Sequence, residues 1–121
     1  MKQRVLLRCP DSPNCVSSRS GSTGHFVEPI GYSGSGEDAF DRLKETIVAL
    51  PGTRILESDQ FYLHAEFRTR WFRFKDDFEA ILDEENRAIQ IRSASRVGYW
   101  DLGANRRRVE KIRSLMERPP E

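Results

Sequence analysis

Carboxylate, hydroxyl, amide and guanidinium groups gather near the end of this chain in a pattern that suggests a site. Residues 92–107 read as a strand that passes through a glycine turn into a capped helix, with polar residues at positions expected to be buried. An unpartnered buried polar group costs about 1–3 kcal/mol, so such groups are expected to bind one another. The pattern predicts a polar network between a sheet and the last helix, made by Asp76, Ser93, Ser95, Asn105 and Arg106.

Strand pairing and helical periodicity place this network. A short link at residues 84–87 pairs Asp76 with Ser95, on the face of the sheet that points to the core. Steps of about 100° per residue put Asn105 in the middle of the apolar stripe of the last helix. The network has two interpretations: a structural clamp that fixes how the helix docks, or the floor of a site with Asp76 as the reactive carboxylate.

A second candidate site lies on the opposite, charged face of the sheet. A tight turn at residues 69–70 would align His64, Lys75 and Arg96 across three strands. Like charges directly opposite one another are unfavourable unless a negative group lies among them. The row therefore predicts a site for an anionic small molecule or an acidic protein surface.

Two further residues belong to this predicted binding face. Arg92 faces outward opposite Glu79, and Trp71 would add apolar contact area if it is exposed. Alternatively, a neighbouring acid such as Asp77 neutralises the bases, or their long side chains extend into water. The charged face is then an ordinary solvated surface.

Cys9 and Cys15 enclose a short proline-containing loop. They are either free thiols in a reducing compartment or a small disulfide in an exported protein. Cys15 is a candidate nucleophile only if a nearby positive group lowers its pKa; Arg8 and Arg19 are the local candidates, and His25 or His64 could do so only if the fold brings it close. The spacing of the two cysteines does not match a zinc site, so we expect no metal and no cofactor.

The composition indicates one globular domain. The chain has 121 residues, of which 37% are hydrophobic and 32% charged. Residues 57–85 carry nine acids against four bases, and residues 92–113 carry seven bases against two acids. This split favours pairing within the chain over nucleic-acid binding. No segment has the ~18 apolar residues that would span a bilayer, so we expect a cytoplasmic protein, or an exported one if a leader has been removed.

The elements that position these groups follow from periodicity. Residues 1–35 are rich in Ser, Gly and Pro and predict an irregular arm, with 26–30 as its one candidate strand; residues 36–118 form the core domain. A helix starts after Ser35 and ends at Pro51-Gly52, and a second starts at Asp101. Extended segments are expected at 53–57, 61–69, 71–82 and 88–97. The fold class is therefore α+β: an antiparallel meander of four to five strands with two helices on one face.

Alternation and helical spacing also predict the core. Tyr99 and Trp100 are expected to close the end of the core, or alternatively to stack on a base or sugar. The other residues expected to point inward are Phe40, Leu43, Ile47, Leu50, Phe61, Leu63, Ala65, Phe67, Phe72, Phe74, Phe78, Leu82, Ile89, Ile91, Val97, Leu102, Val109, Ile112 and Met116.

Three separated motifs resemble those of domain of unknown function family 1499. They begin at Cys9 (Cys-Pro-Asp-Ser-Pro-Asn-Cys-Val-Ser-Ser), at Phe72 (Phe-Arg-Phe-Lys-Asp-Asp-Phe-Glu) and at Arg92 (Arg-Ser-Ala-Ser-Arg-Val-Gly-Tyr, then Asp-Leu-Gly-Ala-Asn-Arg from Asp101). The resemblance covers nearly the whole chain and implies a bacterial protein. It assigns no activity to any residue.

Two functional classes follow. The first, which we favour, is a non-catalytic binding or interaction module that uses the charged sheet face. The second is a small enzyme with Asp76 or Cys15 as the reactive group, which would need a cleft that converges on those atoms. A purely structural subunit is a third, simpler possibility.

Overall fold

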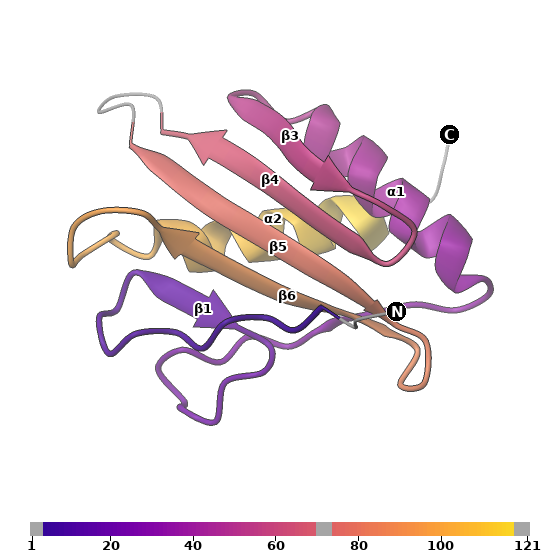
Figure 1. Ribbon diagram of the computed structural model, residues 1–121, viewed down its shortest axis with the longest axis horizontal. Coiled ribbons are helices and arrows are strands. Elements are labelled where there is room, and N and C mark those ends of the chain that lie inside the picture. The colour runs from indigo at the N-terminus through magenta and orange to yellow at the C-terminus, as the bar shows by residue number, and fades with distance from the viewer. Residues whose placement is uncertain (1–3, 70–73, 118–121) are drawn as a thin grey trace.

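The computed structural model describes residues 4–69 and 74–117. It confirms the α+β class, with six antiparallel strands rather than four or five and two helices on one face of the sheet (Figure 1). The strands run in the order β1-β6-β5-β4-β3, and β2 also pairs with β6. The elements are β1 (Cys15–Ser17), β2 (Ile30–Gly31), α1 (Gly36–Val48), β3 (Thr53–Ser58), β4 (Tyr62–Arg68), β5 (Lys75–Asp83), β6 (Ala88–Ser95) and α2 (Ala104–Glu117).

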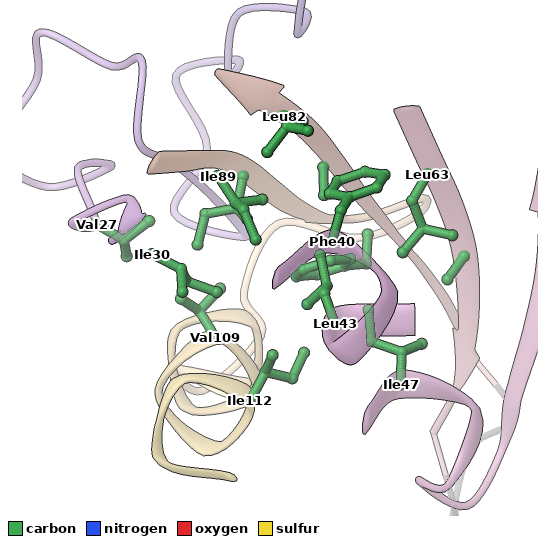
Figure 2. Close-up of a cluster of buried hydrophobic side chains, with 14 of the residues drawn as sticks. Val27, Ile30, Phe40, Leu43, Ile47, Leu63, Leu82, Ile89, Val109 and Ile112 are labelled. Carbon is green, nitrogen blue, oxygen red and sulfur yellow. The ribbon is translucent and has the colours of Figure 1, made fainter. Parts of the chain in front are cut away.

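The core lies between the sheet and the two helices. Ser35 caps α1 as predicted, since its Oγ accepts a hydrogen bond of 3.2 Å from the backbone N–H of Asp38. Apolar side chains of both helices meet those of the sheet in one cluster (Figure 2). Its fully buried members include Phe40, Leu43, Ile47, Leu63, Phe78, Ile89, Ile91, Val109 and Ile112.

Four residues that we expected in the core are exposed instead: Phe61, Phe74, Val97 and Leu102. Each lies just outside the strand or helix to which it was assigned. Alternation and helical periodicity fix the direction of a side chain only within an element, so the predictions were wrong at the ends. Phe72 lies outside the described residues.

The register of the sheet is partly as predicted. Asp76 pairs with Ser95, and Glu79 pairs with Arg92. Between β4 and β5, however, the register is shifted by four residues from the prediction, because the link between these strands is longer than a two-residue turn. An even shift leaves each side chain on its expected face but changes its neighbours.

The segment expected to be an irregular arm contributes two strands to the sheet. β1 pairs with residues 92–94 of β6, and β2 pairs with residues 88–89 of the same strand. The predicted strand at 26–30 is reduced to Ile30 in β2 and a single bridge between Phe26 and Ser17. The arm therefore covers one edge of the sheet.

The opposite edge of the sheet is β3, which pairs with β4 and with no other strand of the described residues. Ile55 pairs with Ala65, but the next pair is Glu57 with His64. Leu56 thus has no counterpart in β4, and β3 contains a β-bulge.

Candidate functional site

The charged face of the sheet carries a group of ion pairs centred on Asp77. Oδ1 of Asp77 lies 2.7 Å from Nε2 of His64, and the carboxylate accepts hydrogen bonds of 2.8 and 2.9 Å from Arg96. Nη2 of Arg96 also lies 3.0 Å from Oε1 of Glu66, and Nζ of Lys75 lies 3.9 Å from the same oxygen. The acids therefore neutralise much of the positive charge on this face.

His64 does not align with Lys75 and Arg96 as expected. It lies opposite Glu79, and the residue opposite Lys75 is Arg68. The backbone N–H of Arg96 donates to the carbonyl oxygen of Lys75. A row of three bases does cross the sheet, but its members are Arg68, Lys75 and Arg96; we call it the basic row. Arg68 makes no ion pair within the described residues.

The pKa of Asp77 links this group to stability. Burial alone would raise the pKa of Asp77, but hydrogen bonds from Arg96 and His64 outweigh burial and hold it below its usual value. Asp77 therefore stabilises the fold above its unfolded pKa of about 3.9, and this contribution is lost as the pH falls through the lower, folded value.

We therefore expect the stability difference between the wild-type protein and Asp77→Asn to depend on pH. The wild-type protein should be the more stable near neutral pH, and the difference should shrink as the pH falls below about 4. Urea unfolding at a series of pH values measures this. A difference that stays constant down to the acid limit would contradict the role of the Asp77 carboxylate.

Arg92 lies beside this group and is mostly covered. Its Nη1 is 3.6 Å from Oε1 of Glu79, and its Nε is buried without a hydrogen-bond partner in the described part of the chain. Glu79 also accepts a hydrogen bond of 2.6 Å from the hydroxyl of Tyr62. Burial first, and then this hydrogen bond, raise the pKa of Tyr62. Arg92 thus offers little exposed surface to a ligand, and Trp71 lies outside the described residues.

The predicted polar network forms between β6 and α2. Oγ of Ser93 donates to Oδ1 of Asn105 at 2.7 Å, and Nδ2 of Asn105 lies 3.0 Å from Oγ of Ser95 and 2.9 Å from Oδ2 of Asp101. Asn105 and Ser93 are fully buried, and Asp76 beside them is 2% exposed. The buried positions predicted for Asn105 and Asp76 are confirmed.

The guanidinium of this network belongs to Arg108, whereas we expected that of Arg106. Nη2 of Arg108 lies 2.8 Å from Oδ2 of Asp76 in an ion pair without an aligned hydrogen bond. Its Nη1 donates to Oδ1 of Asn105 at 2.8 Å. Residues three apart share a helix face, so Arg108 lies above Asn105. Arg106 directly follows Asn105 and therefore points to a different side of the helix. It is exposed, and its guanidinium donates hydrogen bonds to backbone carbonyl oxygens of the arm.

The connection between β6 and α2, residues 96–103, projects from the end of the sheet (Figure 1). We call it the aromatic loop. Its large apolar side chains are exposed: Val97 by 58%, Tyr99 by 56%, Trp100 by 73% and Leu102 by 85%. The expectation that Tyr99 and Trp100 close the core is therefore wrong. The two rings instead pack edge to face on each other, with centroids 5.0 Å apart.

The backbone of the aromatic loop is anchored although its side chains are exposed. The carbonyl oxygen of Gly98 accepts a hydrogen bond of 2.7 Å from Nδ2 of Asn14. The carboxylate of Asp101 accepts backbone hydrogen bonds of 2.8 and 3.1 Å at the start of α2. Leu102 has a φ of 54°, in the left-handed region that leucine rarely adopts. These contacts anchor the backbone on both sides of Tyr99 and Trp100.

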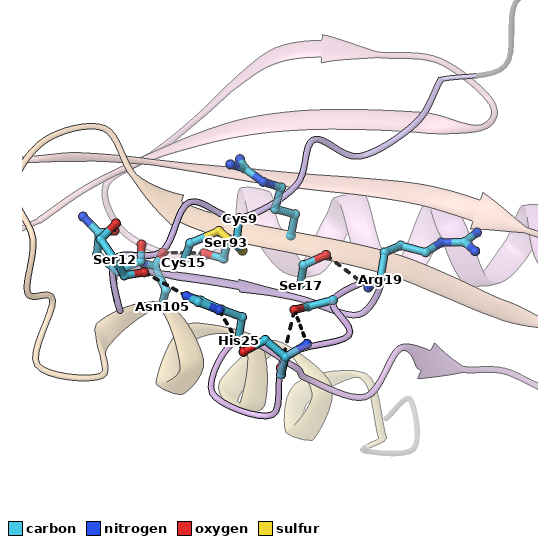
Figure 3. Close-up of a disulfide and its surroundings, with 12 residues drawn as sticks. Cys9, Ser12, Cys15, Ser17, Arg19, His25, Ser93 and Asn105 are labelled. Atoms are coloured by element: carbon cyan, nitrogen blue, oxygen red, sulfur yellow. Dashed lines mark hydrogen bonds between the residues drawn. A yellow bond between two sulfur atoms is a disulfide. The ribbon is translucent and has the colours of Figure 1, made fainter.

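Cys9 and Cys15 form a disulfide, which decides between the two forms that the sequence left open (Figure 3). Cys15 is therefore not available as a nucleophile in this state. Nε2 of His25 lies 2.9 Å from the carbonyl oxygen of Ser12, within the loop that the disulfide closes. The disulfide and this contact join the N-terminal segment to the turn that follows β1.

Two hollows lie along the N-terminal segment. One, of about 390 Å³, lies between residues 6–11 and 17–25. The other is an open groove of about 910 Å³ that residues 4–6 form with the links before β4 and after β5. Neither is lined by Asp76 or Cys15, the two candidate reactive groups.

The fold and these surfaces define a small α+β protein with helices on one face of its sheet and charged groups on the other. The chain belongs to the family described as Protein of unknown function (DUF1499), whose model matches residues 5–116. This confirms the family resemblance of its motifs. No curated protein and no solved structure matches the chain. In the part of the chain that the structure describes, neither helix has the length and apolar character needed to cross a membrane.

Proposed function

We propose that this protein is a non-catalytic interaction module that binds an acidic protein partner through the aromatic loop. The observation that carries the proposal is the exposure of four large apolar side chains on an anchored loop. Exposed apolar patches mark contact surfaces, and tyrosine and tryptophan contribute strongly to binding energy at protein interfaces.

Charge near the loop supports an acidic partner. The basic row crosses the sheet at the end from which the aromatic loop leaves, and Arg96 is the first residue of that loop. Phe74, directly before β5, adds a half-exposed aromatic ring at the same end. Acidic residues around an apolar contact on the partner would complement this surface and speed association. Within the basic row, Arg68 is the base that makes no ion pair in the described residues, so it carries most of the charge open to a partner. Acids already bind the other bases of this face, which are His64, Lys75, Arg92 and Arg96.

The anchored backbone of the aromatic loop supports a role of this loop in binding. Ordering a flexible loop costs free energy when a complex forms, and a loop held in one shape avoids much of that cost. The state of the candidate reactive groups supports a non-catalytic role. Asp76 is paired with Arg108, and Cys15 is in the disulfide.

Peptide selection from a random phage-displayed library tests this proposal. Peptides selected on the wild-type protein are expected to combine acidic and apolar residues. Their affinity should fall at least tenfold for Tyr99→Ser/Trp100→Ser, because the buried aromatic area is lost. It should also fall for Arg68→Glu/Lys75→Glu, which reverses the charge beside the loop. Fluorescence anisotropy of the labelled peptides measures both effects.

Val48→Ser is the matched control, since Val48 is exposed on α1 and is not part of the aromatic loop or the basic row. It should leave peptide affinity unchanged. Selected peptides that bind the Tyr99→Ser/Trp100→Ser variant as tightly as the wild-type protein would refute the proposal. Loop-dependent binding to vesicles of phosphatidylserine and phosphatidylcholine, with no peptide selected, would also refute it and assign the loop to a membrane surface.

A further inference from the structure

The hollow of about 390 Å³ beside the disulfide is separate from the aromatic loop and has the groups of an anion site. We propose that it binds a small phosphate monoester. Its walls come from two segments, the N-terminal residues 6–11 and the turn after β1 at 17–25. Figure 3 shows Ser17 near Cys9 of the N-terminal segment, and it shows the side chain of Arg19 extending away from the disulfide, where its guanidinium contacts Asp83.

Two arginines supply the positive charge. Arg8 lines the hollow and makes no ion pair or hydrogen bond within the described residues. Arg19 lines it from the other wall, and its Nη2 is 3.5 Å from Oδ2 of Asp83, with 56% of the side chain exposed. Such a long and exposed contact can be exchanged for a ligand at little cost. Guanidinium groups bind phosphate oxygens in pairs of hydrogen bonds, which favours phosphate over a halide.

A buried hydroxyl adds a directed donor. Ser17 is 2% exposed and lines the hollow. Its Oγ accepts a hydrogen bond of 3.1 Å from the backbone N–H of Arg19, and its own hydrogen has no acceptor within the described residues. The hydroxyls of Ser20 and Ser22 are already used, since Ser20 donates to the carbonyl oxygen of Ser22 at 3.4 Å and Ser22 contacts Nδ1 of His25 at 3.3 Å. Ser17 is therefore the hydroxyl that is free to donate to a phosphate oxygen.

The size and lining of the hollow indicate a monoester rather than inorganic phosphate alone. Leu6 and Leu7 form an apolar part of the lining. A volume of about 390 Å³ exceeds that of a phosphate group and falls in the range of small-molecule sites. Asp11 also lines the hollow and reduces its positive charge, but the lining still has two arginines against this one acid. The organic part of the ester would lie against the leucines.

NMR titration of the ¹⁵N-labelled full chain tests this inference. With glycerol 3-phosphate, the backbone amides of Ser17, Arg19 and Gly21 are expected to show saturable shifts. Inorganic phosphate should bind the same amides more weakly, and glycerol should not shift them. Arg8→Gln/Arg19→Gln should weaken glycerol 3-phosphate binding at least tenfold. Both arginines are exposed, so the double variant is expected to remain folded. Its NMR spectrum checks this directly.

Arg54→Gln, at an exposed position of β3, is the matched control and should bind as the wild-type protein does. Absence of saturable shifts at the turn with glycerol 3-phosphate would overturn the inference. Equal affinity of the double variant and the wild-type protein would overturn it as well. The titration does not involve the aromatic loop, so its outcome is independent of the interaction proposed above.

Discussion

Replacing Arg108 with leucine is expected to lower the free energy of unfolding by about 3–5 kcal/mol. The substitution leaves the carboxylate of Asp76, which is only 2% exposed, without the cation that lies 2.8 Å away. A buried charge that loses its partner is far more destabilising than the absence of both charges. Urea unfolding followed by circular dichroism measures the loss.

Two further variants make this prediction specific. Arg106→Leu is the matched control on the same helix, and it should cost no more than about 1 kcal/mol because Arg106 is exposed. The double variant Asp76→Leu/Arg108→Leu should recover part of the stability lost in Arg108→Leu, since no unpaired charge remains. Equal losses for Arg106→Leu and Arg108→Leu would show that Arg108 does not hold Asp76.

Asn105→Ala is expected to destabilise the protein by about 2–3 kcal/mol. The amide is fully buried, and it binds Ser93, Ser95 and Arg108. Removing the amide leaves these groups without some of their hydrogen-bond partners. They lie between sheet and helix, where water has little access and cannot replace the amide. Thermal and urea unfolding measure the effect. Ser114→Ala, at an exposed position of the same helix, is the control and should change stability by less than about 0.5 kcal/mol.

The sequence was sufficient to place Asp76 and Asn105 because each position depends on a short-range rule. The link at residues 84–87 is a tight turn, so the register between β5 and β6 follows from its centre. Asn105 lies in an apolar stripe whose helical spacing is regular. The link between β4 and β5 is longer, and no local rule fixes its length, so His64 was assigned the wrong neighbours.

The aromatic loop could not be predicted from residue type. Tyr99, Trp100 and Leu102 gain free energy when they leave water, but this preference does not say whether the chain itself or a partner covers them. Leu102 also continues the apolar stripe of α2 by spacing, yet α2 begins only at Ala104. The left-handed backbone at Leu102 turns the chain out of the helical pattern before that point.

β1 was missed for a different reason. Cys15, Val16 and Ser17 are all buried, so buried and exposed positions do not alternate along β1. A strand of three residues without alternation gives no periodic signal. The arm therefore appeared irregular, although its pairing with β6 extends the sheet.

The unpaired Leu56 in β3 protects the open edge of the sheet from other copies of the chain. A strand that pairs on one side only presents backbone N–H and C=O groups on which a second molecule could add a strand. The bulge interrupts this row of groups, and the exposed charges of Arg54 and Glu57 flank it. The other edge is formed by the short strands β1 and β2, which offer few backbone groups for pairing. Because one edge carries a bulge and the other consists of strands of only three and two residues, the protein is expected to resist growth into β-sheet fibres at high concentration.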